Sequence, residues 1–460
     1  NQMSSQQHHK RSAFSGKIGF VLSAAGASVG LGNIWRFPYL AAKYGGGIFL
    51  LIYIVLALTF GYTMIVAETA IGRMSGKSPV GAFHSFGKSK WFGFGGWINA
   101  IIPILIVPYY SVIGGWVIKY LIEYFMGHSG IVAADGYFTD FITNGISTEV
   151  CFVIFALITL TIIYAGVQNG IERVSKFMMP ILVVLSVIIA VYSVTRPGAL
   201  AGVKYFLIPN LDNFSWMTVV TAMGQMFYSL SISMGILITF GSYMKKDISI
   251  EDSTRNVEIF DTAIAIMAGL MIIPAVFAFS GGDPETLQAG PSLMFITIPK
   301  VFDSMGLGTA IGIIFFLLVL FAAITSSIAL TESAVSTFQD ELHWNRKKAT
   351  LIVGVIMIAL GTLSSLGYGP LAGVTIIGMQ FLDFFDFLTN SVMMPIAAIT
   401  TCLLVSRVIG TKGIEAEVLH GESKFRRKGI FNFMVKYLCP IFAAIILISS
   451  VANAFGWISM

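Results

Sequence analysis

Two polar, glycine-rich stretches interrupt long apolar runs of the chain, and their backbone could bind an ion and a carboxylate. The first, GASVGLGNIWRFPY at 26–39, contains Gly26, Gly30 and Gly32 and carries the charge of Arg36. Glycine weakens a helix because it loses more conformational freedom on folding than any other residue. Unwound backbone inside a membrane presents carbonyls to a cation and a helix N-terminus to an anion. Spacing such as Gly26/Gly30 also serves close packing between helices, which is the alternative for this stretch alone.

A second interruption, about 200 residues later, favours the binding interpretation. GQMFYSLSISMG at 224–235 is polar and has a glycine at each end, in the middle of another apolar run. Paired interrupted helices at corresponding positions of two halves are typical of transporters, where they form a site at the middle of the membrane.

The elements that must position these stretches are membrane-spanning helices. The chain has 460 residues, 56% hydrophobic and 11% charged, with a mean hydropathy of +0.83, whereas soluble domains are about a quarter charged. Eleven apolar runs are long enough to cross roughly 30 Å of hydrocarbon as helices. They lie at 17–43, 47–74, 97–126, 149–166, 171–195, 215–242, 256–281, 307–338, 349–367, 372–406 and 432–457. We predict an all-α integral membrane protein with 11 transmembrane helices, surrounded by membrane lipids.

Lysine and arginine residues set the predicted orientation. If the N-terminus is cytoplasmic, 22 of the 28 lysines and arginines fall inside, which satisfies the positive-inside rule. The six on the outer side are Arg36, Lys43, Lys119, Arg196, Lys204 and Lys300. The net charge of +5 is therefore a topology signal, and nothing in the sequence indicates a nucleic-acid partner.

An odd number of helices per unit inverts the second copy, so spans one to five and six to ten are predicted to form a 5+5 inverted repeat. Helices 1 and 6 are the broken ones, and one extra helix follows the repeat. The predicted parts are a cytoplasmic N-terminal tail at 1–16 with an inner-gate residue, repeats at 17–195 and 215–406, an extracellular connection at 196–214, a cytoplasmic loop at 407–431, and an eleventh helix with a short outer C-terminus at 432–460.

Cysteine and histidine usage argues against redox and metal chemistry. Cys151, Cys402 and Cys439 are far apart inside spans, and no histidine or cysteine cluster has metal-ligand spacing. A membrane enzyme would need a nucleophile, a base or a metal cluster, and no such group is evident. An ion channel usually needs a repeated pore or a ring of subunits, which a single asymmetric chain does not suit. These two classes remain as the alternative functions.

Seven motifs in order along the chain resemble the neurotransmitter:sodium symporters, in particular their bacterial amino-acid members, which have the LeuT-type fold. The motifs are GLGNIWRFPY at 30–39, GGG at 45–47, PYYSVIGGW at 108–116, GIERVSKFMMP at 170–180, GQMFYSLSISMG at 224–235, FAAITSSIALTES at 321–333 and DFFDFLTN at 383–390. The resemblance implies sodium-coupled import of neutral, mostly hydrophobic amino acids by alternating access. It implies no enzymatic activity and a location in the bacterial cytoplasmic membrane.

The same resemblance implies two sodium sites made of oxygen ligands, which suit a hard cation. The first would use the Ser28 carbonyl, Asn33, Ser229 and Asp261, completed by the carboxylate of the substrate. The second would use carbonyls of Gly26, Val29 and Ala322 and hydroxyls of Thr325 and Ser326. Taken alone, the hydroxyls of a TSS sequence in an apolar helix more often donate to backbone carbonyls of the preceding turn. This is the alternative for the hydroxyls of Thr325 and Ser326.

A substrate cavity is likewise implied. Its residues would be Leu31, Gly32, Ile106, Tyr110, Phe227, Tyr228, Ser229, Ser231, Met234, Ser326 and Leu330. Tyr110 would donate to the substrate carboxylate. Monoamine carriers of the family have an aspartate at the position of Gly30, so glycine favours an amino acid. Aromatic and methionine side chains at helical spacing more often simply pack in the protein core. This is the alternative for these side chains.

Charged pairs are expected at both ends of the cavity. Arg36 and Asp386 would close the outer side, with Asp383 as the second candidate partner, and unpaired charges there would be costly. Arg11 and Asp340, with Tyr243 nearby, match the inner pair of the family. Snorkelling at helix ends is the alternative.

Chloride is not expected as a cofactor. The chloride ligands of relatives correspond to Tyr53, Gln225 and Ser229, and Asp261 would place a fixed negative charge beside them.

Overall fold

Membrane-spanning helices make up most of the computed structural model, which describes residues 11–281 and 291–458. Within these residues nine helices are long and apolar enough to cross a membrane. The pair Lys17–Ser28 and Gly32–Lys43, bent by 62°, makes a tenth span. A second interrupted pair, Trp216–Ser229 and Ile236–Ser242, is separated by residues 230–235, and the count of 11 spans stays a prediction. The all-α membrane fold with broken helices 1 and 6 is therefore confirmed, while the division into two inverted repeats stays a prediction.

The described helices have the following bounds. They are α2 (Lys17–Ser28), α3 (Phe37–Lys43), α4 (Gly47–Leu56), α5 (Tyr62–Ser75), α6 (Pro79–His84), α7 (Lys90–Phe125), α8 (Ser129–Val132), α9 (Tyr137–Thr143), α10 (Gly145–Tyr164), α11 (Arg173–Val194), α12 (Leu200–Leu207), α13 (Trp216–Ser229), α14 (Ile236–Ser242), α15 (Ile250–Ser280), α16 (Ile298–Asp303), α17 (Gly308–Leu342), α18 (Arg346–Leu366), α19 (Phe381–Asp386), α20 (Met394–Leu403), α21 (Thr411–Val418), α22 (Lys428–Phe433) and α23 (Cys439–Ala454). Short π-helical segments such as Gly32–Arg36 and Ala57–Gly61 continue several of them.

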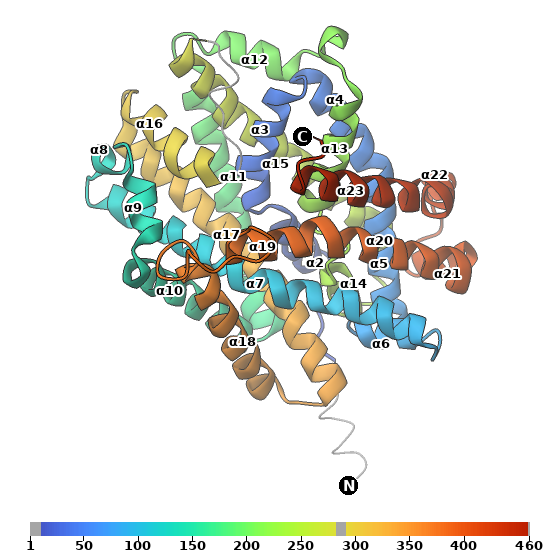
Figure 1. The fold of residues 1–460 in the computed structure, drawn as a ribbon. Coiled ribbons are helices and arrows are strands. Elements are labelled where there is room, and N and C mark those ends of the chain that lie inside the picture. The colour runs from blue at the N-terminus through green and yellow to red at the C-terminus, as the bar shows by residue number, and fades with distance from the viewer. Residues whose placement is uncertain (1–10, 282–290, 459–460) are drawn as a thin grey trace.

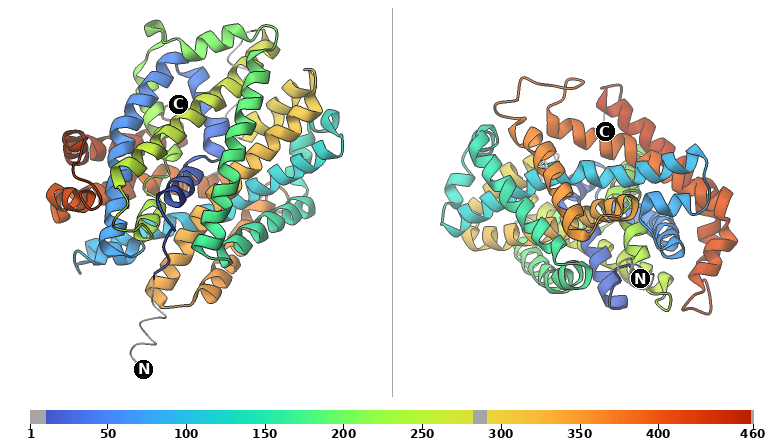
Figure 2. Two further views of the ribbon diagram at one scale, coloured as in Figure 1. Left: turned by 180° about the vertical axis from the view of Figure 1, so that it is seen from behind. Right: turned by 90° about the horizontal axis from the view of Figure 1, so that it is seen from below.

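The broken helices lie in the middle of the bundle, with α7 and α17 passing beside them (Figures 1 and 2). Most residues of α7 and α17 are buried, whereas α11 and α23 are largely exposed. Large apolar side chains such as Val184, Val191 and Ile448 cover these outer helices. Such side chains contact lipid, so the apolar exterior is the expected surface of a membrane protein.

The second break has strained backbone that a buried carboxylate supports. Ser231, Ser233 and Gly235 have φ angles of 54°, 63° and 77°, a left-handed region that residues other than glycine seldom adopt. The backbone N–H of Ser233 lies 3.0 and 3.2 Å from the two carboxylate oxygens of Glu68 in α5, whose side chain is fully buried. This interaction satisfies a backbone donor that unwinding frees from the helix.

Helix α21, in the predicted cytoplasmic loop, is tied to the second span by a buried ion pair. The Arg73 Nε donates to the Glu417 Oε1 at 2.8 Å, and its other nitrogens donate to the carbonyls of Ile248 at 2.6 Å and Glu417 at 2.8 Å. Lys246 also pairs with Glu417 at 2.8 Å. The contacts join the connection after α14 to the connection between the last two spans, so these two connections have a defined arrangement.

Three spans begin six to nine residues away from their predicted starts. The seventh span begins at Ile250 and not at 256, because its helix is capped by Ser249, whose side chain accepts the Asp252 N–H. The tenth span begins at Phe381 and not at 372, because residues 367–380 form turns in which Ile377 and Gly378 have φ angles of 54° and 75°. The third span begins at Lys90 and not at 97, because its helix extends beyond the apolar run on the predicted cytoplasmic side. Residues 1–10 of the predicted tail, with Lys10, lie outside the described residues.

Candidate functional site

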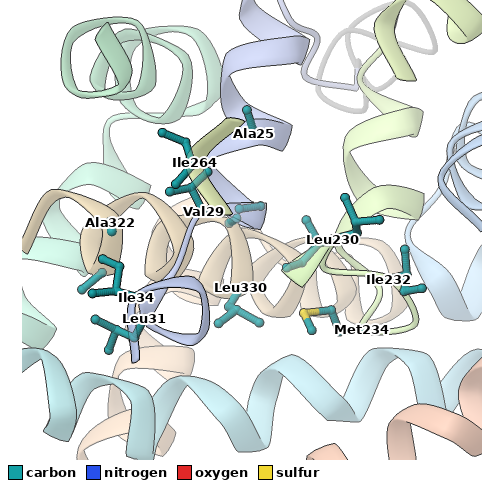
Figure 3. Close-up of a cluster of buried hydrophobic side chains, with 14 of the residues drawn as sticks. Ala25, Val29, Leu31, Ile34, Leu230, Ile232, Met234, Ile264, Ala322 and Leu330 are labelled. Carbon is teal, nitrogen blue, oxygen red and sulfur yellow. The ribbon is translucent and has the colours of Figure 1, made fainter. Parts of the chain in front are cut away.

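A cavity of about 430 Å³ lies between the two breaks and α7. Nine of the predicted substrate residues line it, namely Leu31, Gly32, Ile106, Tyr110, Tyr228, Ser231, Met234, Ser326 and Leu330. Figure 3 shows Leu330 of α17 between Leu31 at the first break and Met234 at the second. Sequence segments about 200 and 300 residues apart therefore meet around one space.

The polar end of this cavity is formed by the unwound backbone. The Leu31 N–H donates to the Tyr110 hydroxyl at 3.3 Å, and the Ser231 Oγ donates to the Ala27 carbonyl at 2.7 Å. A Cβ at position 30 would lie 2.7 Å from the Ser326 Oγ, which is closer than side-chain carbons approach. A side chain at position 30 would therefore force the Ser326 hydroxyl to rotate and would crowd the Tyr110 hydroxyl, 3.0 Å from the same Cβ.

The opposite wall is apolar. Ile106, Ile113, Met234 and Leu330 contribute aliphatic or thioether groups. The charged residues among those that line the cavity are Arg36, Asp383 and Asp386, and all three belong to the predicted outer ends of the first and tenth spans. A charged ligand group directed at the apolar wall would lose hydration without gaining a partner.

Phe227 and Ser229, also predicted as substrate residues, do not line the cavity. The Phe227 ring is buried and packs against Phe60, with 5.7 Å between the ring centroids. Ser229 points instead to the first predicted sodium site. Phe227 and Ser229 lie on α13 just before the break, where the direction of the helix points their side chains away from the cavity.

Three of the four predicted ligands of the first sodium site come together in a buried cluster. The Ser229 Oγ lies 2.5 Å from the Asp261 Oδ1 and 2.9 Å from the Asn33 Oδ1, and the Asn33 Nδ2 donates to the Asp261 Oδ1 at 3.2 Å. The Tyr53 hydroxyl donates to the Asp261 Oδ2 and lies 3.0 Å from the Ser229 Oγ. In the described part of the chain, no lysine or arginine contacts Asp261. The cluster thus combines oxygen donors with an unneutralised carboxylate, which fits a hard cation.

Ser28, the fourth predicted ligand, is not joined to this cluster. Its hydroxyl donates to the Ala24 carbonyl at 3.0 Å, and its own carbonyl accepts the Gly30 N–H at 3.0 Å. The Ser28 carbonyl is thus engaged locally at the end of α2, although Ser28 does line the cavity.

The second predicted sodium site brings α2 and α17 together. The Ser326 Oγ lies 3.0 Å from the Gly26 carbonyl oxygen and 3.4 Å from that of Val29. The Thr325 hydroxyl bonds back to its own helix, 3.1 Å from the Ala322 carbonyl. The Thr325 hydroxyl therefore bonds to the preceding turn of its own helix, as the alternative predicted. The Ser326 hydroxyl instead contacts the broken helix α2. All five predicted ligands supply oxygen, so the donor set fits sodium.

The inner predicted pair is formed. Both Asp340 oxygens accept from the Arg11 Nη1, at 2.7 and 2.8 Å, and the Arg11 Nε donates to the Ser242 Oγ at 2.8 Å. The guanidinium also lies over the Tyr243 ring, 5.0 Å from its centroid. These contacts join the N-terminal segment to α14 and α17 and close the predicted cytoplasmic side.

The outer predicted pair is not formed. Arg36 and Asp386 both line the cavity but make no direct ion pair among the described residues. The Arg36 guanidinium lies 4.1 Å from the centroid of the Tyr228 ring, and Asp386 accepts from Asn390 and, at 3.3 Å, from Tyr109. The structure therefore has a closed inner side and separated outer groups. Asp383, the second candidate, instead accepts from Tyr368 at 2.9 Å.

Comparison with protein families matches residues 11–130 and 139–456 to the sodium:neurotransmitter symporter family. The chain belongs to this family. This symporter is therefore a membrane transporter and not an enzyme.

Relatives of the symporter match over nearly its whole length. YhdH of Bacillus subtilis, a sodium-dependent transporter, is 34% identical over 440 residues, covering 94% of this chain and 96% of its own. A sodium-dependent transporter of Haemophilus influenzae is 32% identical over 458 residues, covering 96% and 98%. The solved structure of MhsT in complex with L-phenylalanine is similar with a TM-score of 0.85 and 35% identity, covering 96% of this chain and 100% of that one.

Two buried acidic residues of the symporter were missed by sequence reasoning. Glu68 supports the second break, and Glu332 forms a 2.6 Å ion pair with Arg346 while accepting from the Tyr243 hydroxyl at 2.5 Å. Tyr243 thus links the Arg11 network to a second ion pair. Both glutamates lie inside apolar runs, and an ionisable residue in a membrane span was the signal that could have found them.

Ser231→Ala is expected to weaken substrate binding about fivefold, because one hydrogen bond contributes roughly 1 kcal/mol net. The lost bond is the one to the Ala27 carbonyl that joins the two breaks. Ser233→Ala is the matched control, since Ser233 has the same backbone conformation but its buried Oγ has no hydrogen-bond partner. The measurement is the substrate concentration for half-maximal uptake. Equal effects of the two substitutions would contradict this role of Ser231.

Proposed function

We propose that this symporter imports neutral, mostly apolar α-amino acids together with sodium ions by alternating access. The observation that carries the proposal is the cavity between the two breaks, whose one end is unwound backbone and whose other wall is apolar. The complex of MhsT with L-phenylalanine supports the same class of substrate.

Substrate recognition would divide between these two ends. The carboxylate would lie near the Tyr110 hydroxyl and the first sodium ion, where Gly30 leaves space. The ammonium would face carbonyls at the breaks, including that of Ala27. The side chain would then contact Ile106, Met234 and Leu330. Each buried methylene contributes roughly 0.8 kcal/mol, so larger apolar side chains should bind more tightly up to the size of the cavity.

Two sodium ions would couple to this binding in different ways. An ion at Asn33, Ser229 and Asp261 would be attracted by the uncompensated carboxylate and would share the substrate carboxylate as a ligand. An ion between α2 and α17 would replace the Ser326 contacts with the Gly26 and Val29 carbonyls and would connect the broken helix to a buried one. A ligand shifts a conformational equilibrium only if its affinity differs between the two conformations. An ion at the second site would meet this condition, because α2 must move relative to α17 during transport and would carry part of the ligand set with it.

The described conformation would correspond to the outward-facing state of the transport cycle, in which substrate enters from outside. Its inner network around Arg11 is closed, while Arg36 and Asp386 are apart across the cavity. Closure would bring these two charges together above the substrate, and opening inward would break the contacts of Arg11 with Asp340. We place the symporter in the bacterial cytoplasmic membrane with its N-terminus inside.

The test is uptake of radiolabelled leucine into proteoliposomes with an imposed sodium gradient. Concentrative uptake should require sodium and disappear when potassium replaces it. Unlabelled phenylalanine, methionine and leucine should compete, and glutamate and lysine should not. Equal uptake in potassium would overturn sodium coupling, strong competition by glutamate or lysine would overturn the apolar pocket, and competition by glycine and alanine alone would mean a smaller cavity.

A further inference from the structure

Three sulfur atoms meet in the apolar interior, away from the substrate cavity. They belong to Met64 of α5, Cys402 of α20 and Cys439 of α23, and all three side chains are fully buried. The Cys402 thiol donates to the Met64 sulfur at 3.7 Å, and the Cys439 thiol is hydrogen-bonded to the Cys402 thiol. None of these residues lines the substrate cavity. The two cysteines, far apart in the sequence, are therefore neighbours in the structure.

The backbone around the sulfurs is locally irregular. Helices α20 and α23 run side by side and both contact the second span (Figure 1). A π-helical segment adjoins each helix, since Ala57–Gly61 precedes α5, Leu404–Ile409 follows α20 and Met434–Leu438 precedes α23. The last of these segments contacts the other two. Single π-helical turns within α-helices are rare and frequently mark functional sites, and the three sulfurs lie where three of them converge.

The position of the sulfurs in the membrane favours free thiols. All three lie in the predicted cytoplasmic half of their spans, which cover Gly47–Ser75, Phe381–Ile409 and Lys428–Ala454. The cytoplasm is reducing and keeps thiols out of disulfides. Pro440, directly after Cys439, has no backbone N–H and so removes one helical hydrogen bond at the start of α23. The helix is therefore easier to open beside the sulfurs, where a small ion could enter.

Three soft ligands select a particular class of metal. Thiolate and thioether sulfur favour Cu(I), zinc and iron–sulfur clusters. Structural zinc sites need four ligands and iron–sulfur clusters need four cysteines, whereas three sulfurs suffice for a trigonal Cu(I) ion. Within the described residues, no group of three histidine, cysteine or carboxylate side chains is placed to hold a metal. The thioether of Met64 is therefore what completes this ligand set.

Spacing and charge both fit a monovalent ion. First-row metals lie roughly 2.3 Å from thiolate sulfur, so sulfurs at the corners of a trigonal site are roughly 4 Å apart. The distance of 3.7 Å between the Met64 and Cys402 sulfurs is close to this spacing. A net charge in an apolar interior is costly. Cu(I) with one thiolate is neutral, whereas a divalent ion would have to displace the protons of both cysteines.

We propose that Met64, Cys402 and Cys439 form a Cu(I) site that ties the second, tenth and eleventh spans together. Binding displaces the proton of one cysteine to solvent and forms one copper–thiolate bond, and the other thiol and the thioether complete the trigonal set. No electron is transferred, because copper enters as Cu(I). Since the ligands come together only in the folded chain, the ion stabilises the folded symporter.

The test is Cu(I) binding by the purified full-length symporter in the absence of oxygen, measured by competition with the chelator bicinchoninate. One Cu(I) per chain should bind at this site, Ag(I) should displace it as a soft monovalent ion, and Zn(II) should not. X-ray absorption at the copper edge should show three sulfur neighbours at roughly 2.3 Å. Absence of binding, or copper with only nitrogen and oxygen neighbours, would overturn the proposal.

Variants identify the ligands. Loss of a residue that only orients a metal ligand costs roughly 10- to 100-fold in metal affinity, so Cys402→Ser, Cys439→Ser and Met64→Leu should each weaken Cu(I) binding at least tenfold. Cys151→Ser and Met271→Leu are the matched controls at other buried positions and should bind Cu(I) as wild type does.

The melting temperature without copper shows that each variant folds, and Cu(I) should raise it in wild type and in the two controls only. Unchanged Cu(I) affinity in the three site variants would overturn the proposal. Both readouts are obtained without transport, so the result is independent of the proposed substrate.

Discussion

Asp261→Asn is expected to weaken sodium activation of uptake about tenfold or more. The Asp261 carboxylate is fully buried, lies 2.5 Å from the Ser229 Oγ and accepts from Tyr53 and Asn33. Asparagine keeps the shape but removes the negative charge, and interactions with a charged group contribute about 1.5 to 3 kcal/mol each. A loss of 1.4 kcal/mol is tenfold in affinity. The measurement is the sodium concentration for half-maximal uptake, with exposed Asp140→Asn as the control.

Replacing chloride by gluconate tests whether uptake depends on the negative charge of the Asp261 side chain or on its shape. Wild-type uptake should be unchanged when gluconate replaces chloride, because the fixed carboxylate beside Tyr53 and Ser229 supplies the negative charge. Uptake by Asp261→Asn should increase when chloride is restored, because the anion can then approach the neutral amide. A wild-type protein that loses activity in gluconate would contradict this interpretation.

Arg11→Ala is expected to shift the conformational equilibrium about tenfold toward inward-open states. The substitution removes the bonds to Asp340 and to Ser242 and the stacking on Tyr243, all of which belong to the closed inner side. Each charge-assisted bond contributes about 1.5 to 3 kcal/mol when buried, and the partial exposure of the Arg11–Asp340 pair reduces that contribution. A cysteine at Ser23, a buried position in α2 whose hydroxyl has no partner, serves as the reporter. A hydrophilic maleimide applied from the cytoplasmic side should label it about tenfold faster in the variant.

Two further variants show whether this effect belongs to the ion pair. Asp340→Asn should accelerate labelling as Arg11→Ala does, and the double variant should add little, because both changes break the same contact. Lys88→Ala removes an exposed charge on the same side and should leave labelling at the wild-type rate. Labelling of Arg11→Ala at the wild-type rate would mean that other contacts, such as Glu332 with Arg346, keep the inner side closed.

The site shows where sequence reasoning loses information. The resemblance implied both Phe227 and Tyr228 as cavity residues, yet Phe227 packs on Phe60 while Tyr228 lines the cavity. Neighbours in a helix point in different directions, and only packing selects the inner one. Arg36 and Asp386 have the charges of a pair, but whether they meet depends on the conformation. Ser28 matches a ligand position, but its carbonyl is engaged at the end of α2.

The sequence by itself determined the membrane solvent and the positions of the two breaks. These features depend on local quantities: an apolar run must match the thickness of the bilayer, and glycine-rich polar backbone inside it is tolerated only around a protein-enclosed cavity. Only the tertiary structure decided which side chains meet across the chain. The contacts of Tyr53 with Asp261 and of Arg73 with Glu417 join residues far apart in sequence. Such contacts are selected by the packing of whole helices and not by the local pattern of either partner.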